Sequence, residues 1–149
     1  MLKILKATKD DDLIIAQLTS NLLSELKNTE VSSSELLSIC SNLNHHEDRW
    51  HALIAYYDEK PIGIISIYEV AAIYAKGRLG IIQEFYVDPS YRSYGIGKSL
   101  INEATTFAQQ NHFKHLEVGT PNIEKWPRTL QFYKNQNFQT IGDRMKLYL

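Results

Sequence analysis

The order of elements predicted along the chain favours a mixed α/β fold with a meander at its centre. A short strand and two helices come first, three successive strands occupy the middle, and a helix, a strand, a helix and two short strands follow. A strictly alternating, doubly wound fold would interpose a helix between successive strands. The chain of 149 residues predicts one domain over residues 1–149, because neither a repeat nor a Pro/Gly-rich linker divides it.

The N-terminal third predicts one strand and two helices. Residues 2–5 mix apolar and polar side chains as a short strand does. Thr8 is expected to cap a helix whose first turn holds aspartates, which are favourable at the positive end of the helix dipole. A serine cap near residues 32–34 is expected to begin the second helix. The inward faces of the two helices are Ile15, Leu18, Leu22 and Leu26, then Leu36, Leu37, Cys40 and Leu43.

The middle of the chain predicts three strands separated by turns. Residues 52–57 and 62–74 flank a turn at residues 58–61, and a turn at Lys76 and Gly77 leads into a strand over residues 79–87. Four apolar residues of this last strand share a parity, namely Leu79, Ile81, Phe85 and Val87.

The C-terminal part predicts two helices with strands around them. A turn containing glycines opens a helix near Gly95, with Ile96, Leu100, Ala104, Phe107 and Ala108 on one side. Residues 115–118 predict a fifth strand, and Pro127 can start a helix that runs to about Asn135. Asn137 is a plausible left-handed stop, and residues 139–149 predict two short strands.

Composition excludes several classes of protein. Apolar residues make up 44% and charged residues 22% of the chain, as in average globular proteins. The formal charge of −1 gives no global field that would recruit nucleic acid or an anionic membrane. Apolar runs are far too short to span a bilayer. The single cysteine, Cys40, cannot form an internal disulfide and favours a reducing compartment, so we expect a cytoplasmic protein.

The residues that follow the fourth predicted strand indicate a phosphate site. Between Arg92 and Lys98, two glycines lie at the mouth of a helix, where unpaired N–H groups and the helix dipole favour anions. This pattern predicts a cofactor that bears a diphosphate. A Walker loop would need a glycine at Arg92, and a dinucleotide-binding fingerprint would need one at Leu100, so both are disfavoured.

Arg92-x-x-Gly95-x-Gly97, preceded by residues 85–91, closely resembles the acetyl-CoA-binding segment of the GNAT superfamily of N-acetyltransferases. Residues 130–138, an aromatic pair followed by Asn-Phe, are similar to that superfamily's second landmark. The resemblance implies a central, mostly antiparallel sheet that is splayed between its fourth and fifth strands and flanked by about four helices. It implies transfer of an acetyl group from acetyl-CoA to an amine, and no metal is expected.

The resemblance also implies roles for individual residues. The backbone of residues 85–87 would pair with the pantetheine arm, and the following loop amides would hold the pyrophosphate. The Val87 amide would donate to the oxyanion, and Tyr133 would lie beside the thioester sulfur as the acid. Trp126 departs from the asparagine that many members carry. The expected cofactor-binding residues are Phe85, Tyr86, Val87, Arg92, Ser93, Tyr94, Gly95, Ile96, Gly97, Lys98 and Ser99.

The reaction also requires a base. At pH 7 only about one in a few thousand primary amines with a pKa of about 10.4 is neutral. Deprotonation of the amine therefore adds roughly 4–5 kcal/mol to the free-energy barrier of the attack. Glu84 is the first candidate, acting directly or through water, because it shares the parity of Ile82 and Tyr86 one residue before the pantetheine segment. Glu69 is the reserve candidate.

The acceptor is expected to be a small molecule or protein that bears an amine, which carboxylates and aromatic rings would attract. The residues expected to line the acceptor site are His45, His46, Glu47, Asp48, Trp50, Tyr68, Glu69 and Tyr74. The three histidines His45, His46 and His51 lack a second ligand group at a recognisable spacing, which disfavours zinc. The resemblance leaves a homodimer open. A non-catalytic acyl-CoA-binding regulatory module is the alternative function.

Overall fold

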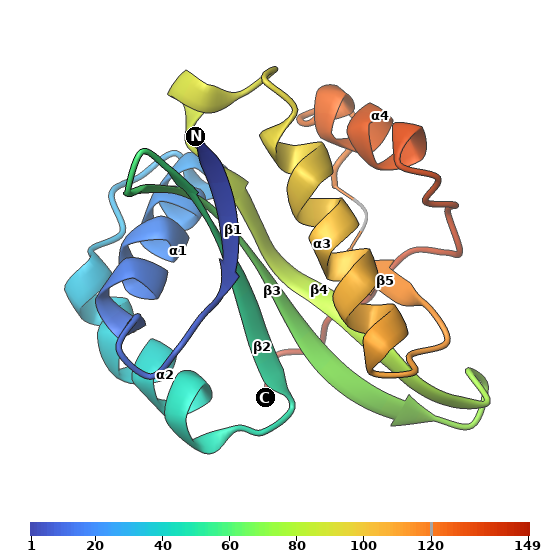
Figure 1. Cartoon of the computed structure of the whole chain (residues 1–149). Helices are drawn as coiled ribbons and strands as arrows, with labels where there is room; N and C mark the ends of the chain where they lie inside the picture. Colours follow the sequence, from blue (N-terminus) through green and yellow to red (C-terminus); the bar gives the residue numbers. More distant parts are fainter. Residues whose placement is uncertain (120) are drawn as a thin grey trace. The chain divides into compact units, whose positions relative to one another are not determined.

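A five-stranded sheet in the order β1-β2-β3-β4-β5 organises the fold (Figure 1). The computed structural model describes residues 1–119 and 121–149. They form two compact units, Met1–Glu117 and Val118–Leu149. The strands are β1 (Leu2–Lys6), β2 (Trp50–Tyr57), β3 (Lys60–Ala72), β4 (Gly77–Val87) and β5 (Leu116–Val118), and the helices of the first unit are α1 (Asp12–Lys27), α2 (Ser33–His46) and α3 (Ile96–Gln110). The predicted mixed α/β class is confirmed.

Strands β1 to β4 form the predicted antiparallel meander. Asp58 and Glu59 both have positive φ angles, 47° and 69°, which is the geometry of the two-residue turn that matches strand twist in a hairpin. Strand β5 runs parallel to β4. Near the start of β4, the Lys114 N–H donates to the Arg78 carbonyl over 2.7 Å, and the Gly80 N–H donates to His115 over 3.1 Å.

The ends of the first two helices follow local side-chain chemistry. Helix α2 begins after Ser32, whose hydroxyl accepts from the Ser34 N–H, as predicted. Helix α1 begins at Asp12, later than a cap at Thr8 would place it. Thr8 and Asp11 instead bond reciprocally, since the Asp11 carboxylate accepts from the Thr8 N–H over 2.6 Å and the Asp11 N–H donates to the Thr8 carbonyl over 3.1 Å. The turn formed by these two residues precedes the helix.

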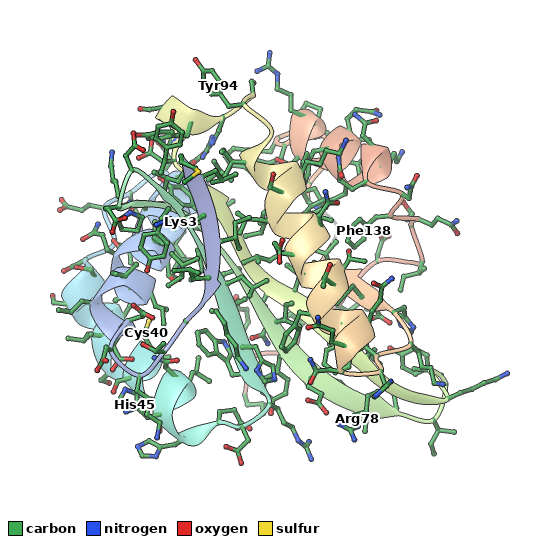
Figure 2. All side chains as sticks on the ribbon, in the orientation of Figure 1. Lys3, Cys40, His45, Arg78, Tyr94 and Phe138 are labelled. Carbon is green, nitrogen blue, oxygen red and sulfur yellow. The ribbon has the colours of Figure 1, made fainter. Side chains whose placement is uncertain are left out.

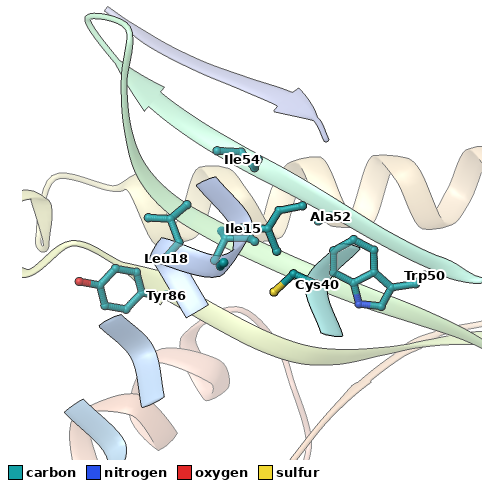
Figure 3. Close-up of a cluster of buried hydrophobic side chains, with 9 residues drawn as sticks. Ile15, Leu18, Cys40, Trp50, Ala52, Ile54 and Tyr86 are labelled. Carbon is teal, nitrogen blue, oxygen red and sulfur yellow. The ribbon is translucent and has the colours of Figure 1, made fainter. Parts of the chain in front are cut away.

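Helices cover both faces of the sheet, with α1 and α2 on one face and α3 on the other (Figure 1). The core beneath α1 and α2 brings together side chains from both helices and from three strands (Figure 3). Because strand residues alternate between faces, the even-numbered members of β2 and β3 lie on this face. The buried members of the core are Ile15, Ala16, Leu18, Cys40, Trp50, Ala52, Ile54, Ile64 and Tyr86.

A β-bulge in β4 overturns the simple parity expected for that strand. Ile82 lies opposite Ile67 and Tyr86 lies opposite Ile64, so the register shifts by one residue between these pairs. Ile64 and Ile67 lie on opposite faces of β3, and therefore Ile82 and Tyr86 also lie on opposite faces despite their shared parity. Glu84, at the bulge, lies on the same face as Tyr86 and on the opposite face from Ile82.

The second unit contains helix α4 (Pro127–Asn135), which begins and ends as predicted. Asn137 adopts a left-handed φ of 69°. The Phe138 N–H donates to the Tyr133 carbonyl and the Asn137 N–H to the Lys134 carbonyl, both over 3.0 Å, which is a Schellman helix end. This backbone motif fixes the turn of helix that carries Tyr133.

The two strands expected within residues 139–149 are wrong, because these residues contain no strand. Their apolar side chains alternate with polar ones, but Ile141, Met145 and Leu147 are exposed instead of packing on a sheet. Alternation is a local pattern, whereas a strand needs a hydrogen-bonded neighbour. Among the helices of the described residues, none is long and apolar enough to cross a membrane.

Candidate active site

The loop between β4 and α3 presents backbone N–H groups at a helix N-terminus. Ser93 and Gly95 both adopt left-handed conformations, with φ angles of 69° and 81°, and successive turns of this kind form an anion-binding concavity. Tyr94 lies between them and is exposed at the tip of the loop (Figure 2). A Cβ atom added at Gly95 would meet nothing within 4 Å. A phosphate can therefore approach the first amides of α3, from Ile96 to Lys98.

Arg92, at the start of the loop, contributes a clamp to the site. Its guanidinium forms a bidentate ion pair with Glu25 of α1, over 2.6 and 2.8 Å, and its Nε donates to the Val87 carbonyl over 2.8 Å. The pKa of Arg92 is raised, chiefly by the hydrogen bonds to Glu25. The Arg92 N–H donates to the Pro89 carbonyl over 3.3 Å. Arg92 thus ties the loop to α1 and to the end of β4.

The ladder between β3 and β4 decides where the backbone groups of the β4 end point. The Asp88 N–H donates to the Ile62 carbonyl of β3 over 2.7 Å. In an antiparallel ladder, alternate residues direct their N–H and C=O groups to the same side. Phe85 and Val87 therefore direct these groups away from β3, as the bond from Arg92 to the Val87 carbonyl shows. The predicted pairing with a pantetheine arm requires this direction.

Glu84 is a half-buried carboxylate held by one serine. The hydroxyl of Ser66 donates to Glu84 Oε2, and the Glu84 N–H donates to the Ser66 Oγ over 3.0 Å. Ser66 is itself 1% exposed. Burial raises the pKa of Glu84, and the bond from Ser66 partly offsets this shift. A carboxyl with a raised pKa, three residues before the end of β4, is a candidate for a general base.

The reserve candidate, Glu69, lies on the opposite face of β3 from Ser66. Its carboxylate pairs with Arg78 over 2.8 Å and lies 3.9 Å from His51. His51 in turn packs on the Phe107 ring of α3, with 4.8 Å between centroids. Burial first and Lys6 second lower the pKa of this histidine. Glu69 belongs to this separate cluster and is not brought to Glu84.

The other residues expected to line the acceptor site are dispersed. His45, at the end of α2 (Figure 2), lies 2.8 Å from the Asp12 carboxylate of α1. Tyr74, in the turn between β3 and β4, donates to Glu117 over 2.8 Å. Only the aromatic residues Trp50 and Tyr68 share the sheet face of Glu84. Within residues 1–119 and 121–149, no three potential ligand side chains gather as a metal site would require.

Tyr133 is buried in the second unit. Its ring packs edge-on against Phe132 and Phe138, with centroids 5.6 and 5.5 Å away. Burial raises its pKa to about 12. A thiol has a pKa of about 8.5, so full proton transfer from this tyrosine to a thiolate would be uphill by about 5 kcal/mol. The hydroxyl is better suited to donate a hydrogen bond than to release its proton.

Sequence reasoning missed two residues that organise the site, Ser66 and Glu25. Neither belongs to a local motif, and each is separated from its partner by many residues along the chain. The alternation of β3 does mark Ser66 as the polar member of a buried apolar run, which was the one available signal. Trp50 also carries a buried indole N–H that has no hydrogen-bond partner among the described residues.

The sequence model of the Acetyltransferase (GNAT) family matches residues 16–138. No curated protein matches the chain significantly.

Solved structures of similar fold extend over nearly the whole chain. A possible acetyltransferase from Clostridium difficile 630 superposes with a TM-score of 0.84 at 21% identity, covering 100% of this chain and 97% of its own. An aminoglycoside acetyltransferase from an uncultured soil metagenomic sample, in complex with sisomicin, gives 0.77 at 20% identity, with 99% and 95% covered. A ribosomal-protein-alanine N-acetyltransferase from Brucella melitensis biovar Abortus 2308 gives 0.77 at 17% identity, with 100% and 99% covered.

Proposed function

Because the chain belongs to the GNAT acetyltransferase family, we propose that it transfers an acetyl group from acetyl-CoA to a primary amine by direct attack on the thioester. The observation that carries the proposal is Glu84, a half-buried carboxylate with a raised pKa. It immediately precedes Phe85, the first of the two residues whose backbone N–H and C=O groups point away from β3. The family accounts for acetyl transfer in general, and the carboxylate supports an amine as the acceptor because an ammonium must lose its proton before it can attack.

The loop before α3 supports acetyl-CoA as the cosubstrate. Its left-handed residues Ser93 and Gly95 and the helix N-terminus suit a pyrophosphate. Lys98 is exposed in the first turn and would add a positive charge. We assign to Arg92 the task of holding this loop, since its guanidinium is already paired with Glu25. Phe85 would pair with the pantetheine through its backbone groups, and the Val87 N–H would be left for the thioester oxygen. Tyr86, which alternates with these two residues and pairs with Ile64, directs its backbone groups to β3 instead. When bound, acetyl-CoA supplies an activated acetyl group.

Three groups of the chain, namely the Glu84 carboxylate, the Val87 N–H and the Tyr133 hydroxyl, would then act in acetyl transfer. Glu84 accepts the proton of the attacking amine, directly or through water, and its raised pKa brings it closer to the working pH. The Val87 N–H donates to the thioester oxygen as negative charge develops there. Tyr133 donates a hydrogen bond to the departing sulfur, and its pKa of about 12 keeps the hydroxyl protonated at every working pH.

Coenzyme release with a panel of amines tests the proposal. The panel comprises small monoamines, polyamines, an aminoglycoside and a peptide with a free N-terminus, and free thiol reports turnover. Sisomicin belongs in the panel because a protein of the same fold is known in complex with it. Release of thiol that depends on an amine and yields its acetylated product supports the proposal. Acetyl-CoA binding without turnover on any amine contradicts it and favours a non-catalytic acyl-CoA-binding module.

A further inference from the structure

The contact between Ser66 and Glu84 is reciprocal and buried. The serine hydroxyl donates to the Glu84 carboxylate, and the same oxygen accepts from the Glu84 backbone N–H over 3.0 Å. One side chain of β3 thus holds both the backbone and the functional group of one residue of β4. Ser66 is 1% exposed, so water does not compete for either bond.

The bulge in β4 explains why Ser66 occupies this place. Ile65 pairs with Phe85 and Ile67 pairs with Ile82, so Ser66 faces two residues of β4, Gln83 and Glu84. An extra residue in a ladder leaves a backbone group without its regular partner. Here the Glu84 N–H donates to the serine oxygen. An aliphatic residue at position 66 would leave that N–H and the carboxylate without these bonds in a buried environment.

We propose that Ser66 is a positioning residue for acetyl transfer: it fixes the Glu84 backbone at the bulge and holds Oε2, so that Oε1 is the oxygen that receives the amine proton. The inference rests on the function proposed above for Glu84. It extends that function because it adds a residue outside both sequence landmarks and makes the geometry of the base depend on β3.

The surroundings of Glu84 make Ser66 its dominant polar partner. From α2, the thiol of Cys40 has a raised pKa, first because of burial and then because of the charge on Glu84, with Asp12 of α1 adding to it. On β4, Tyr86 is the next residue on the same face, and burial raises its pKa as well. Neither group ionises at neutral pH, so neither competes with Ser66 in setting the charge of Glu84.

The pH dependence of kcat/KM for Ser66→Ala tests the inference. The serine bond stabilises the charged carboxylate, and its loss raises the pKa of Glu84 further. We expect the lower break of the profile to move up by about one to two pH units. The matched control is Ser20→Ala, which removes another buried serine whose hydroxyl donates to the Val31 carbonyl over 2.7 Å. The control is expected to lower stability without moving the break.

Two further variants keep the test informative if Ser66→Ala folds poorly. Ser66→Thr retains the hydroxyl and is expected to restore the wild-type break. Ser66→Cys retains a weaker donor of similar size and is expected to give an intermediate break. A break that stays in place in Ser66→Cys or Ser66→Ala while the variant remains folded would overturn the inference.

Direct titration of the Glu84 side-chain carbon by NMR separates this inference from the proposed function. If Glu84→Gln leaves turnover unchanged, Glu84 is not the base and the proposed mechanism fails. The Glu84 titration in wild type and Ser66→Ala still reports whether the serine controls the carboxylate. A titration midpoint that is the same in both proteins would overturn the role of Ser66, whatever the outcome of the activity assay.

Discussion

The loop before α3 and the carboxylate on β4 lie in the same unit, yet they are constructed in different ways. The proposed pyrophosphate site in the loop consists of backbone amides at the N-terminus of α3, around the left-handed residues Ser93 and Gly95. The carboxylate depends on a side chain from another strand and on a one-residue shift in register. A backbone site can be encoded in a short motif, whereas a buried side-chain site requires the whole sheet to be in register. The two should therefore respond differently to mutation.

The largest effect is expected from Glu84→Gln. The amide cannot accept the amine proton, so kcat/KM should fall by about 10²- to 10⁴-fold. The affinity for acetyl-CoA, measured by calorimetry, should remain unchanged because the loop amides do not involve Glu84. Glu69→Gln is the control, since Glu69 lies on the other face of β3. An equal loss of turnover in both variants would mean that the base has been misassigned.

Tyr133→Phe should have the next largest effect. Removal of one hydrogen-bond donor to a developing charge costs about 10²-fold in kcat, while calorimetry should find the affinity for acetyl-CoA nearly unchanged. The pKa of about 12 predicts that Tyr133 itself produces no alkaline limb in the rate profile between pH 6 and 10. Tyr148→Phe, at an exposed position of the tail, is the control. Equal turnover in wild type and Tyr133→Phe would remove Tyr133 from the mechanism.

Gly95→Glu tests the backbone site in isolation. A carboxylate at the mouth of α3 should repel the pyrophosphate and weaken acetyl-CoA binding by at least about tenfold, or 1.4 kcal/mol. The positive φ of 81° strains any side chain, so a matched control is needed. Gly142→Glu provides it, because Gly142 also has a positive φ, 136°, and open space around it. Equal affinity in the two variants would place the cosubstrate elsewhere.

The loop before α3 and the Glu84 site also differ in how well the sequence alone predicts them. Gly95, Pro127 and Asn137 have roles fixed by backbone geometry, so their places at helix ends could be predicted from residue type. The pair of Ser66 and Glu84 could not, because parity placed Ile82 and Tyr86 on one face and only the β3–β4 register reveals the bulge.

Contacts between residues distant in the sequence account for the other differences between the predicted and the observed structure. The ion pair of Glu25 with Arg92 joins residues of α1 and the loop, and no local pattern encodes it. Conversely, the alternating pattern of residues 139–149 predicts strands, although these residues pair with no sheet neighbour as strands would. Local patterns predict which structures a segment can adopt, and the neighbours decide which of these it does adopt.

The pH dependence of the free energy of unfolding should differ between wild type and Glu84→Gln. Because the pKa of Glu84 is raised in the fold, the native state binds more protons than the unfolded chain between the unfolded and folded pKa values. Its contribution to stability is fully present below the unfolded value and is lost as the pH rises through the folded one. Glu84→Gln should therefore gain stability relative to wild type as the pH rises through this window, measured by urea unfolding. A difference that is constant with pH would contradict the raised pKa.

The smallest effect is expected at the ion pair of Glu25 and Arg92, where a side chain of α1 supports the backbone site in the loop before α3. The pair is partly exposed, with 32% and 42% of the two side chains accessible, so its contribution to stability should be below about 1 kcal/mol. Glu25→Gln frees the guanidinium from its partner carboxylate and loosens the tie to α1. We expect a two- to fivefold change in the affinity for acetyl-CoA at most, about 1 kcal/mol, since the amides themselves remain.

A double-mutant cycle with Arg92→Gln tells whether this clamp matters to the cosubstrate. If the loop is self-sufficient, the coupling energy measured in acetyl-CoA binding should be near zero, although the same pair still couples in unfolding. A coupling in binding as large as that in unfolding would show that α1 helps to hold the loop in its binding conformation. In that case the backbone site would depend on distant side chains as much as Glu84 does, and the distinction between the two sites would be one of degree.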